Sequence, residues 1–163
     1  MNVSISMELQ AGRLLHERHW KLVLAESCTG GLLGSRITDV PGSSEYFLGS
    51  IVAYAYEVKA DLLGVSWDTL NSKGAVSRET VLEMARGAQR LIKADIAISV
   101  SGIAGPGGGT PEKPVGTTWI GLVTKDGEWA KLFQFSAGRE ENKVAAVEAA
   151  LNLLLDYLQG KLV

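Results

Sequence analysis

Cysteine and histidine are both scarce in this chain of 163 residues, and their scarcity excludes several kinds of site. The one cysteine, Cys28, allows neither an internal disulfide nor a cysteine-based structural zinc site. The two histidines, His16 and His19, lie three residues apart near the start, without an acidic or cysteine cluster beside them. We therefore expect no bound metal ion.

Strong charge and long apolar runs are also missing. The net charge is −2, and no basic block is present, which argues against a dedicated nucleic-acid-binding protein. No hydrophobic run approaches 18 residues, and no basic segment followed by an apolar one opens the chain. We expect a cytoplasmic enzyme or binding protein that binds neither nucleic acid nor membrane.

Apolar periodicity indicates one domain, residues 1–163, in which helices and strands alternate. We expect helices at residues 3–18, 29–38, 57–63, 68–72, 77–93 and 142–158, and strands at 20–25, 47–55, 95–101, 115–125 and 128–136. Asp126-Gly127 joins the last two strands as a hairpin signal. Interleaved helices and strands with one hairpin predict a mixed sheet that is covered on both faces.

The most informative stretch runs from Leu22 to Gly31, where a short apolar strand leads through small polar residues into a helix. This pattern puts Ser27 at a helix N-terminus and at the carboxyl end of a strand, where free amide groups favour an anion or oxyanion. Ser27 is then either a helix cap or a nucleophile. Cys28 is a rival nucleophile, although a lone cysteine is more often a small buried apolar residue.

A serine nucleophile needs a base, and neither histidine follows the strand that carries Ser27. Lys59 is a candidate, because it lies just beyond the strand that ends near Tyr54. If that strand is parallel to the first, Lys59 and Tyr54 emerge at the same edge as Ser27. A lysine base must be neutral, so its pKa must fall by roughly three units, through burial or a neighbouring cation. Arg139 could be that cation, or could bind a phosphate.

A glycine-rich loop follows the strand that ends at Ser101. Residues 101–109 match neither the phosphate-binding loop of nucleotide hydrolases nor the dinucleotide-binding fingerprint, because the lysine and the following helix are missing. The amides of this loop could still shape an anion pocket.

Several of these segments together resemble the C-terminal domain family of the competence/damage-inducible protein CinA, in the family's order and over nearly the whole chain. The matching segments are Ala25-Glu26-Ser27-Cys28-Thr29-Gly30-Gly31, Pro41-Gly42-Ser43-Ser44, Tyr54 with Glu57 and Lys59, Leu62-Leu63-Gly64-Val65, Gly74-Ala75-Val76-Ser77, Ser101-Gly102-Ile103-Ala104-Gly105-Pro106, Lys113-Pro114-Val115-Gly116-Thr117 and Gly138-Arg139. The larger CinA form carries a further N-terminal domain, so this chain is expected to be the stand-alone form.

The resemblance implies a three-layer α/β/α sandwich with a five-stranded, mixed and mostly parallel sheet. It also implies an amidohydrolase that converts nicotinamide mononucleotide (NMN) into nicotinic acid mononucleotide and ammonia without a cofactor, as in pyridine nucleotide salvage. Ser27 would be the nucleophile and Lys59 the base, with Tyr54 and Arg139 assisting. Substrate contacts are expected from two groups: Thr29, Gly30, Gly31, Ser43 and Ser44 in the first half, and Gly102, Gly105 and Gly107 in the glycine-rich loop. A homo-oligomer, most simply a dimer, is expected.

The chain departs from the family's usual pattern at three positions. Tyr56 stands where Asn is common, Val58 where Ala is usual, and Ala137 where Pro is frequent. Tyr56 lies between Tyr54 and Lys59, so it bears on the fit of the substrate more than on the chemistry. Two alternatives therefore stay open: a catalytically silent nucleotide-binding module, and an amidase or esterase with a different substrate.

Overall fold

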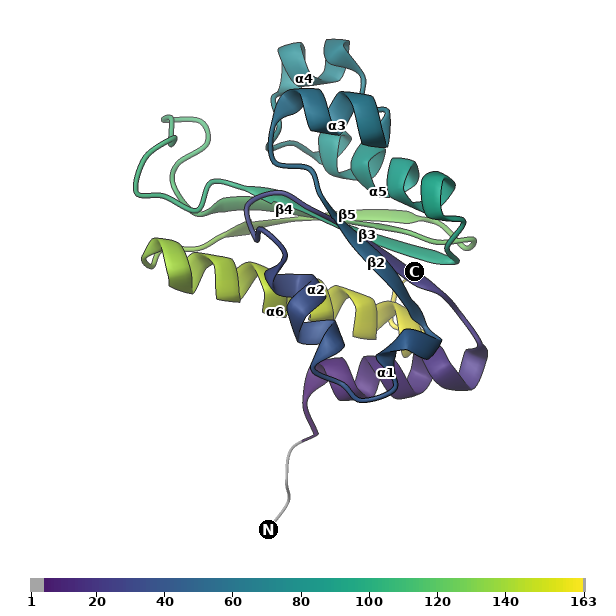
Figure 1. Cartoon of the computed structure of the whole chain (residues 1–163). Coiled ribbons are helices and arrows are strands. Elements are labelled where there is room, and N and C mark those ends of the chain that lie inside the picture. Colours follow the sequence, from purple (N-terminus) through teal and green to yellow (C-terminus); the bar gives the residue numbers. More distant parts are fainter. Residues whose placement is uncertain (1–4, 163) are drawn as a thin grey trace.

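A computed structural model describes residues 5–162 of the chain. A five-stranded sheet forms its centre, with helices on both faces (Figure 1). In chain order the elements are α1 (Met7–Arg18), β1 (Leu22–Glu26), α2 (Leu32–Thr38), the 3-10 helix η1 (Ser43–Glu45), β2 (Phe47–Val52), α3 (Tyr56–Leu63), α4 (Trp67–Lys73), α5 (Arg78–Ile92), β3 (Ile96–Gly102), β4 (Thr117–Val123), β5 (Glu128–Gln134) and α6 (Arg139–Leu158).

The strands are arranged in the order β2-β1-β3-β4-β5. β1 is parallel to both β2 and β3, whereas β4 is antiparallel to β3 and to β5. Four strands therefore run in one direction and β4 alone runs in the other. The mixed, mostly parallel sheet expected from the sequence is confirmed, and β1 lies inside it with a parallel neighbour on each side.

The two faces of the sheet bury two separate apolar clusters. Leu22 and Leu24 of β1 face the cluster beneath α1, α2 and α6, while Val23 and Ala25 face the cluster beneath α3, α4 and α5. Every residue of β1 is buried, which explains why this strand reads as a continuous apolar run instead of an alternating one. Because side chains alternate between the two faces of a sheet along a strand, Glu26 and Ser27, which follow Ala25, point to opposite faces.

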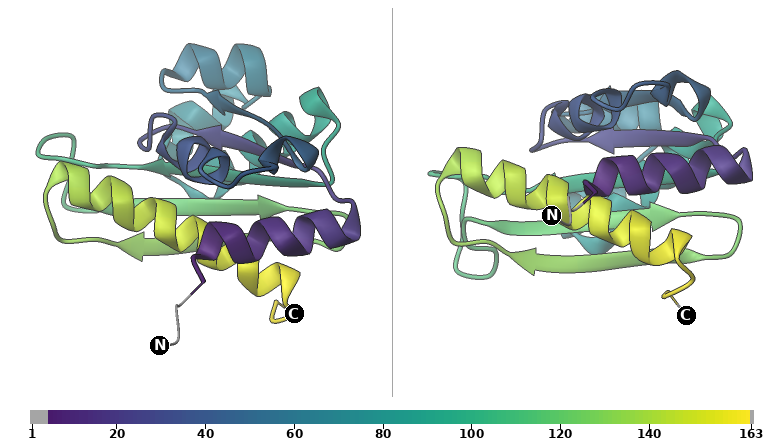
Figure 2. Two further views of the ribbon diagram at one scale, coloured as in Figure 1. Left: turned by 60° about the horizontal axis from the view of Figure 1, so that its bottom comes forward. Right: turned by 90° about the horizontal axis from the view of Figure 1, so that it is seen from below.

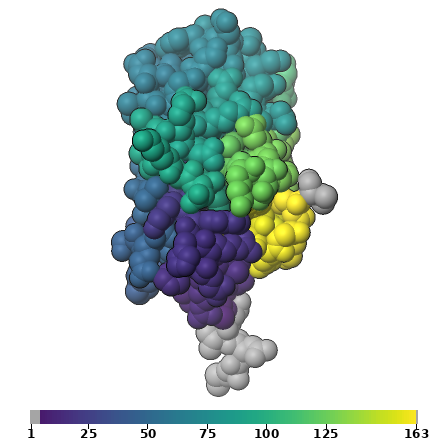
Figure 3. Space-filling model, turned by 90° about the vertical axis from the view of Figure 1, so that its right-hand side faces the viewer, coloured from purple at the N-terminus to yellow at the C-terminus, as the bar shows by residue number. Residues whose placement is uncertain are grey.

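α1 and α6 lie side by side on one face of the sheet in both further views (Figure 2). Figure 3 shows the same neighbourhood from the side, with α1 beside the C-terminal end of α6. The side chain of Arg18 joins the two helices by donating a hydrogen bond to the carbonyl of Leu158, with 2.5 Å between Nη2 and O. No helix within residues 5–162 is long and apolar enough to cross a membrane.

Most predicted elements are confirmed with shifted ends, and three differences matter for the site. α2 begins at Leu32 instead of residue 29, because Gly30 and Gly31 have φ angles of 60° and 101°, which a right-handed helix does not contain. α6 begins at Arg139 instead of residue 142, so Arg139 opens this helix. The short helix η1 was not predicted, and residues 3 and 4 of the helix predicted at 3–18 lie outside the described residues.

Candidate active site

Ser27 follows directly on β1, at the edge of the sheet where β1, β2 and β3 have their carboxyl ends. Its amide donates a hydrogen bond to the carbonyl of Val100 in β3, at 2.9 Å. The side chain of Ser27 is almost fully buried and lies on the sheet face that α3 and α5 cover. Strand alternation puts the preceding residue, Glu26, on the opposite face.

Lys59 comes from α3 and is completely buried, which is rare for a lysine. Its Nζ lies 2.9 Å from Ser27 Oγ, 2.7 Å from the carbonyl oxygen of Ala53 and 2.8 Å from that of Tyr54. A neutral amine has two N–H bonds and one lone pair. The two carbonyls can accept only N–H groups, so in the neutral amine the lone pair remains for the Ser27 hydroxyl. In the ammonium form Nζ donates to all three oxygens, Ser27 Oγ included, whereas in the neutral form the same contact lets the lone pair accept the proton of Ser27.

Burial lowers the pKa of Lys59 from 10.5 to about 8, because an ammonium group loses its hydration inside the protein. The nearby Cys28 acts weakly in the opposite direction, and Arg139 does not contribute. The sequence suggested two causes for a lowered Lys59 pKa, burial and a neighbouring cation, and the structure shows burial. Burial also raises the pKa of the Cys28 thiol to about 11, which keeps the sulfur protonated and disfavours it as a nucleophile.

The N-terminus of α2 is occupied by Glu26, which corrects the expectation that Ser27 and a bound anion share it. The fully buried Glu26 carboxylate accepts hydrogen bonds from the amides of Gly31, Leu33 and Gly34 at 2.9–3.1 Å. It also accepts from the hydroxyls of Thr29 and Ser50, at 2.6 and 2.7 Å. These contacts satisfy the helix amides and hold the turn after Ser27, so Ser27 is not the helix cap.

A cavity of about 180 Å³ opens beside the Ser27–Lys59 pair. Besides these two residues, its lining includes Tyr54, Ala75, Val76, Ser101, Gly102 and Arg139. Arg139 donates from Nη1 to the carbonyl of Gly105 at 2.6 Å, and its Nη2 lies 3.4 Å from the hydroxyl of Tyr54. The structure therefore brings together all four residues predicted to be catalytic: Ser27, Tyr54, Lys59 and Arg139.

The residues predicted to bind substrate are distributed more widely. Gly102 lines the cavity, and Gly105 borders it through its bond with Arg139. Thr29, Gly30 and Gly31 form the turn above Glu26, whereas Gly107 is exposed in the loop. Ser43 and Ser44 belong to η1, which precedes β2 and lies at the opposite end of the sheet from Ser27. Within this chain these two serines are not part of the cavity.

Ser101 is a member of the site that the reading of the sequence did not single out. The parallel register pairs Glu26 with Val100, so the next residues, Ser27 and Ser101, lie on adjacent strands and on the same face. Ser101 is buried in the cavity lining, and its hydroxyl has no hydrogen-bond partner within residues 5–162. A correct pairing of β1 with β3 would have identified it, but nothing in the local sequence specifies that register.

Tyr56 is not part of the cavity lining. Its hydroxyl accepts a hydrogen bond from the amide of Ala75 at 3.2 Å, and its ring lies against that of Trp67 with 6.4 Å between centroids. Tyr56 therefore does not touch the cavity itself but contacts the segment whose residues Ala75 and Val76 line it.

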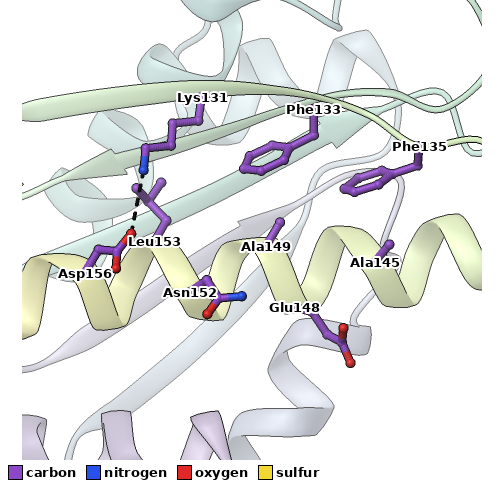
Figure 4. A pocket seen from close by; sticks show the side chains of 9 residues that line it. All are labelled: Lys131, Phe133, Phe135, Ala145, Glu148, Ala149, Asn152, Leu153 and Asp156. Carbon is purple, nitrogen blue, oxygen red and sulfur yellow. Dashed lines mark ion pairs between the residues drawn. The ribbon is translucent and has the colours of Figure 1, made fainter.

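A larger groove of about 380 Å³ lies between β5 and α6. Phe133 and Phe135 form its apolar side, and Lys131 and Asp156 pair at one end with 3.7 Å between Nζ and Oδ2 (Figure 4). No serine, cysteine or histidine lines this groove, so it offers no nucleophile–base pair. Within the described residues, no group of three or more His, Cys, Asp or Glu side chains could hold a metal ion.

The fold and this site define an open α/β protein with a buried serine–lysine pair at the carboxyl edge of its sheet. The model of the CinA C-terminal domain matches residues 4–158 of the chain. The protein therefore belongs to the CinA C-terminal domain family, as the sequence motifs indicated.

Two relatives illustrate the similarity in sequence. A CinA-like protein of Chlorobaculum tepidum is 50% identical over 160 residues, and one of Thermotoga maritima is 46% identical over 155 residues. Each alignment covers 95% of this chain but only 38% of the relative, so the chain spans well under half the length of these proteins.

Two solved structures illustrate the similarity in fold. The competence damage-inducible protein A of Klebsiella pneumoniae is 35% identical with a TM-score of 0.91, and the alignment covers 94% of this chain and 95% of that one. The competence/damage inducible protein CihA of Agrobacterium tumefaciens is 36% identical with a TM-score of 0.87, covering 98% and 99%. The predicted fold class is thereby confirmed, whereas these names state no reaction.

Proposed function

We propose that this protein is a serine–lysine amidohydrolase that converts NMN into nicotinic acid mononucleotide and ammonia. One observation carries the proposal: Lys59 Nζ lies 2.9 Å from Ser27 Oγ and gives its other contacts to two backbone carbonyls. The two carbonyls accept two N–H groups, so in the neutral amine the lone pair is left for the Ser27 hydroxyl, and burial, which lowers the pKa of Lys59 to about 8, makes that neutral form accessible. Membership of the CinA family, whose enzymatically competent members deamidate NMN, supports the choice of substrate.

The reaction would proceed in two halves. Ser27 Oγ attacks the carboxamide carbon of NMN while Lys59 Nζ takes the hydroxyl proton, which gives a tetrahedral intermediate. Lys59 then returns the proton to the amide nitrogen, the C–N bond breaks and ammonia leaves. In the second half Lys59 removes a proton from water, which attacks the carbonyl carbon of the acyl–Ser27 ester. Lys59 then returns this proton to Ser27 Oγ as the ester C–O bond breaks, and the freed carboxylic acid ionises to the carboxylate. The route requires no redox cofactor.

Two features of the site support stabilisation of the oxyanion. The amides of Cys28 and Thr29, directly after the nucleophile, donate to no backbone carbonyl or side-chain oxygen among the residues described. The Ser101 hydroxyl is buried beside them without a partner. An amide that follows the nucleophile is a common oxyanion donor in hydrolases. We therefore assign the Cys28 amide and the Ser101 hydroxyl to this role.

The size of the cavity limits what part of the substrate enters it. At about 180 Å³ it is smaller than typical ligand pockets of roughly 300–1,000 Å³. It would take the pyridine carboxamide, while the ribose phosphate stays at the mouth. Arg139 is exposed there and is the cation best placed to contact the phosphate.

Ammonia release from NMN tests the proposal directly. The wild-type protein should release ammonia and form nicotinic acid mononucleotide, and Ser27→Ala should abolish both while its circular dichroism spectrum stays unchanged. Saturable binding of NMN without ammonia release would instead support a silent binding module. Release from free nicotinamide, but not from NMN, would assign a different carboxamide substrate. Light scattering would test the expected homodimer.

A further inference from the structure

One part of the cavity wall is an irregular segment, Gly74 to Val76, between α4 and α5. We call it the 74–76 wall; Ala75 and Val76 line the cavity from it. Gly74 donates its amide to the carbonyl of Leu70, at 3.0 Å. Among the described residues, the amides of Ala75 and Val76 donate to no backbone carbonyl. Side chains from other elements must therefore hold this wall in place.

Tyr56 contacts the wall through its hydroxyl group. Its hydroxyl accepts the Ala75 amide, with 3.2 Å between N and Oη. Tyr56 is the first residue of α3, and its ring is supported by Trp67 of α4. This hydrogen bond occupies an amide that would otherwise be available to water.

Lys113 contacts the residue that directly precedes the wall, Lys73. It belongs to the loop between β3 and β4, where Thr110 and Lys113 close a turn through two hydrogen bonds of 2.9 and 3.0 Å. From this turn Lys113 Nζ donates to the carbonyl of Lys73, the last residue of α4, at 2.5 Å. A cation at the C-terminus of a helix is favoured by the helix dipole as well.

The two side chains converge on one point. A Cβ atom built on Gly74 would lie 3.4 Å from Lys113 Nζ and 3.8 Å from Tyr56 Oη. Gly74 has a φ angle of 80°, so the chain turns sharply here. Thr80 of α5 adds a third anchor by donating its hydroxyl to the Gly74 carbonyl at 2.7 Å. The wall and the residue before it are thus held by side chains from α3, from α5 and from the loop between β3 and β4.

We propose that Tyr56 and Lys113 are positioning residues that fix the 74–76 wall, and through it the fit of the substrate. This inference deepens the proposed amidohydrolase function and depends on it for the identity of the substrate. Ser27 and Lys59 are held by β1, β3 and the carbonyls of Ala53 and Tyr54. Loosening the wall should therefore raise KM and leave kcat nearly unchanged.

The experiment compares Tyr56→Phe and Lys113→Met with the wild type. Hydrogen exchange should show the amides of Ala75 and Val76 exchanging at least threefold faster in both variants. KM for NMN should rise at least threefold, with kcat changing less than twofold. Lys113→Arg should restore both, because a guanidinium can also donate to the Lys73 carbonyl. Lys131→Met, which removes an exposed lysine on the other face, is the matched control and should change neither.

The hydrogen-exchange measurement tests the positioning role of Tyr56 and Lys113 independently of whether the protein hydrolyses NMN. If the wild type releases no ammonia from NMN, the proposed function fails, yet faster exchange in the variants would still support the positioning role. Unchanged exchange in both variants would overturn the positioning role. A raised KM in Lys113→Met without faster exchange would overturn it for Lys113 and identify a direct contact with the substrate. Tyr56→Phe removes one oxygen atom, and circular dichroism verifies that it folds.

Discussion

Lys59 can accept the proton of Ser27 only while its amine is neutral, and this requirement predicts how the rate depends on pH. The pKa of Lys59 is lowered to about 8, so at pH 7 only about one amine in ten is neutral. With the ordinary pKa of 10.5, the neutral fraction would be about three in ten thousand. Burial of Lys59 therefore increases the population of the active form by roughly 300-fold at pH 7, equivalent to about 3 kcal/mol.

The perturbation is the pH, and the assay is kcat/KM for ammonia release from NMN between pH 6.5 and 9.5. We expect kcat/KM to rise with pH, to reach half of its maximum near pH 8, and to be about tenfold below the maximum at pH 7. The second ionisation of a phosphate falls at about 6, so the substrate's own titration lies below this range. The Cys28 thiol, with a pKa of about 11, titrates above it.

A direct titration connects this profile to Lys59. NMR of protein labelled with ¹³C at the lysine Cε should show one resonance that titrates near pH 8. Lys59→Arg should remove that resonance together with the activity, while Lys131→Arg should retain both. A value of kcat/KM that stays flat from pH 7 to 9, or a Lys59 resonance that titrates near 10.5, would refute Lys59 as the base.

Four further predictions concern buried side chains. Ser101→Ala should lower kcat/KM about tenfold or more and raise the unfolding free energy by about 1 kcal/mol, because it removes an unpartnered buried hydroxyl. Ser99→Ala, two residues earlier on the same strand face, loses the hydrogen bond to the Val81 carbonyl. It should lower the unfolding free energy and leave kcat/KM unchanged, as measured by urea unfolding and ammonia release. Glu26→Gln should destabilise the protein by about 2–3 kcal/mol in the same unfolding assay, since its new N–H₂ group meets hydrogen-bond donors. Cys28→Ala should retain activity, whereas loss of activity there combined with retained activity in Ser27→Ala would identify the sulfur as the nucleophile.

The reading of the sequence reached the active site because parallel strands place their carboxyl ends at one edge. The apolar run at Leu22 and the β-formers after Phe47 identified the two strands, and adjacent parallel placement then brought Lys59 to Ser27. The absence of a histidine after the first strand pointed to lysine as the base. Local periodicity and turn residues indicated the strands, because each depends on neighbours within a few positions, whereas the resemblance to the CinA family was needed to favour Ser27 as a nucleophile over a helix cap.

Other features depended on contacts between distant segments, and no local pattern contains them. Ser27 and Glu26 are consecutive, yet strand alternation directs Ser27 to Lys59 and Glu26 to the N-terminus of α2. Glu26 therefore has the helix-capping role that the local reading offered for Ser27. Ser43 and Ser44 match a family motif but lie at the far end of the sheet.

The sequence by itself determined the order of most elements and indicated that Ser27 and Lys59 lie at one edge of the sheet. Only the tertiary structure decided that Lys59 is fully buried against the Ala53 and Tyr54 carbonyls, that Ser101 lies beside Ser27, and that Lys113 reaches the carbonyl of Lys73. The physical reason is that the pKa of a side chain depends on its burial, and its hydrogen-bond partners depend on which groups lie beside it. Both are set by residues remote in the chain, and only once the layers have packed.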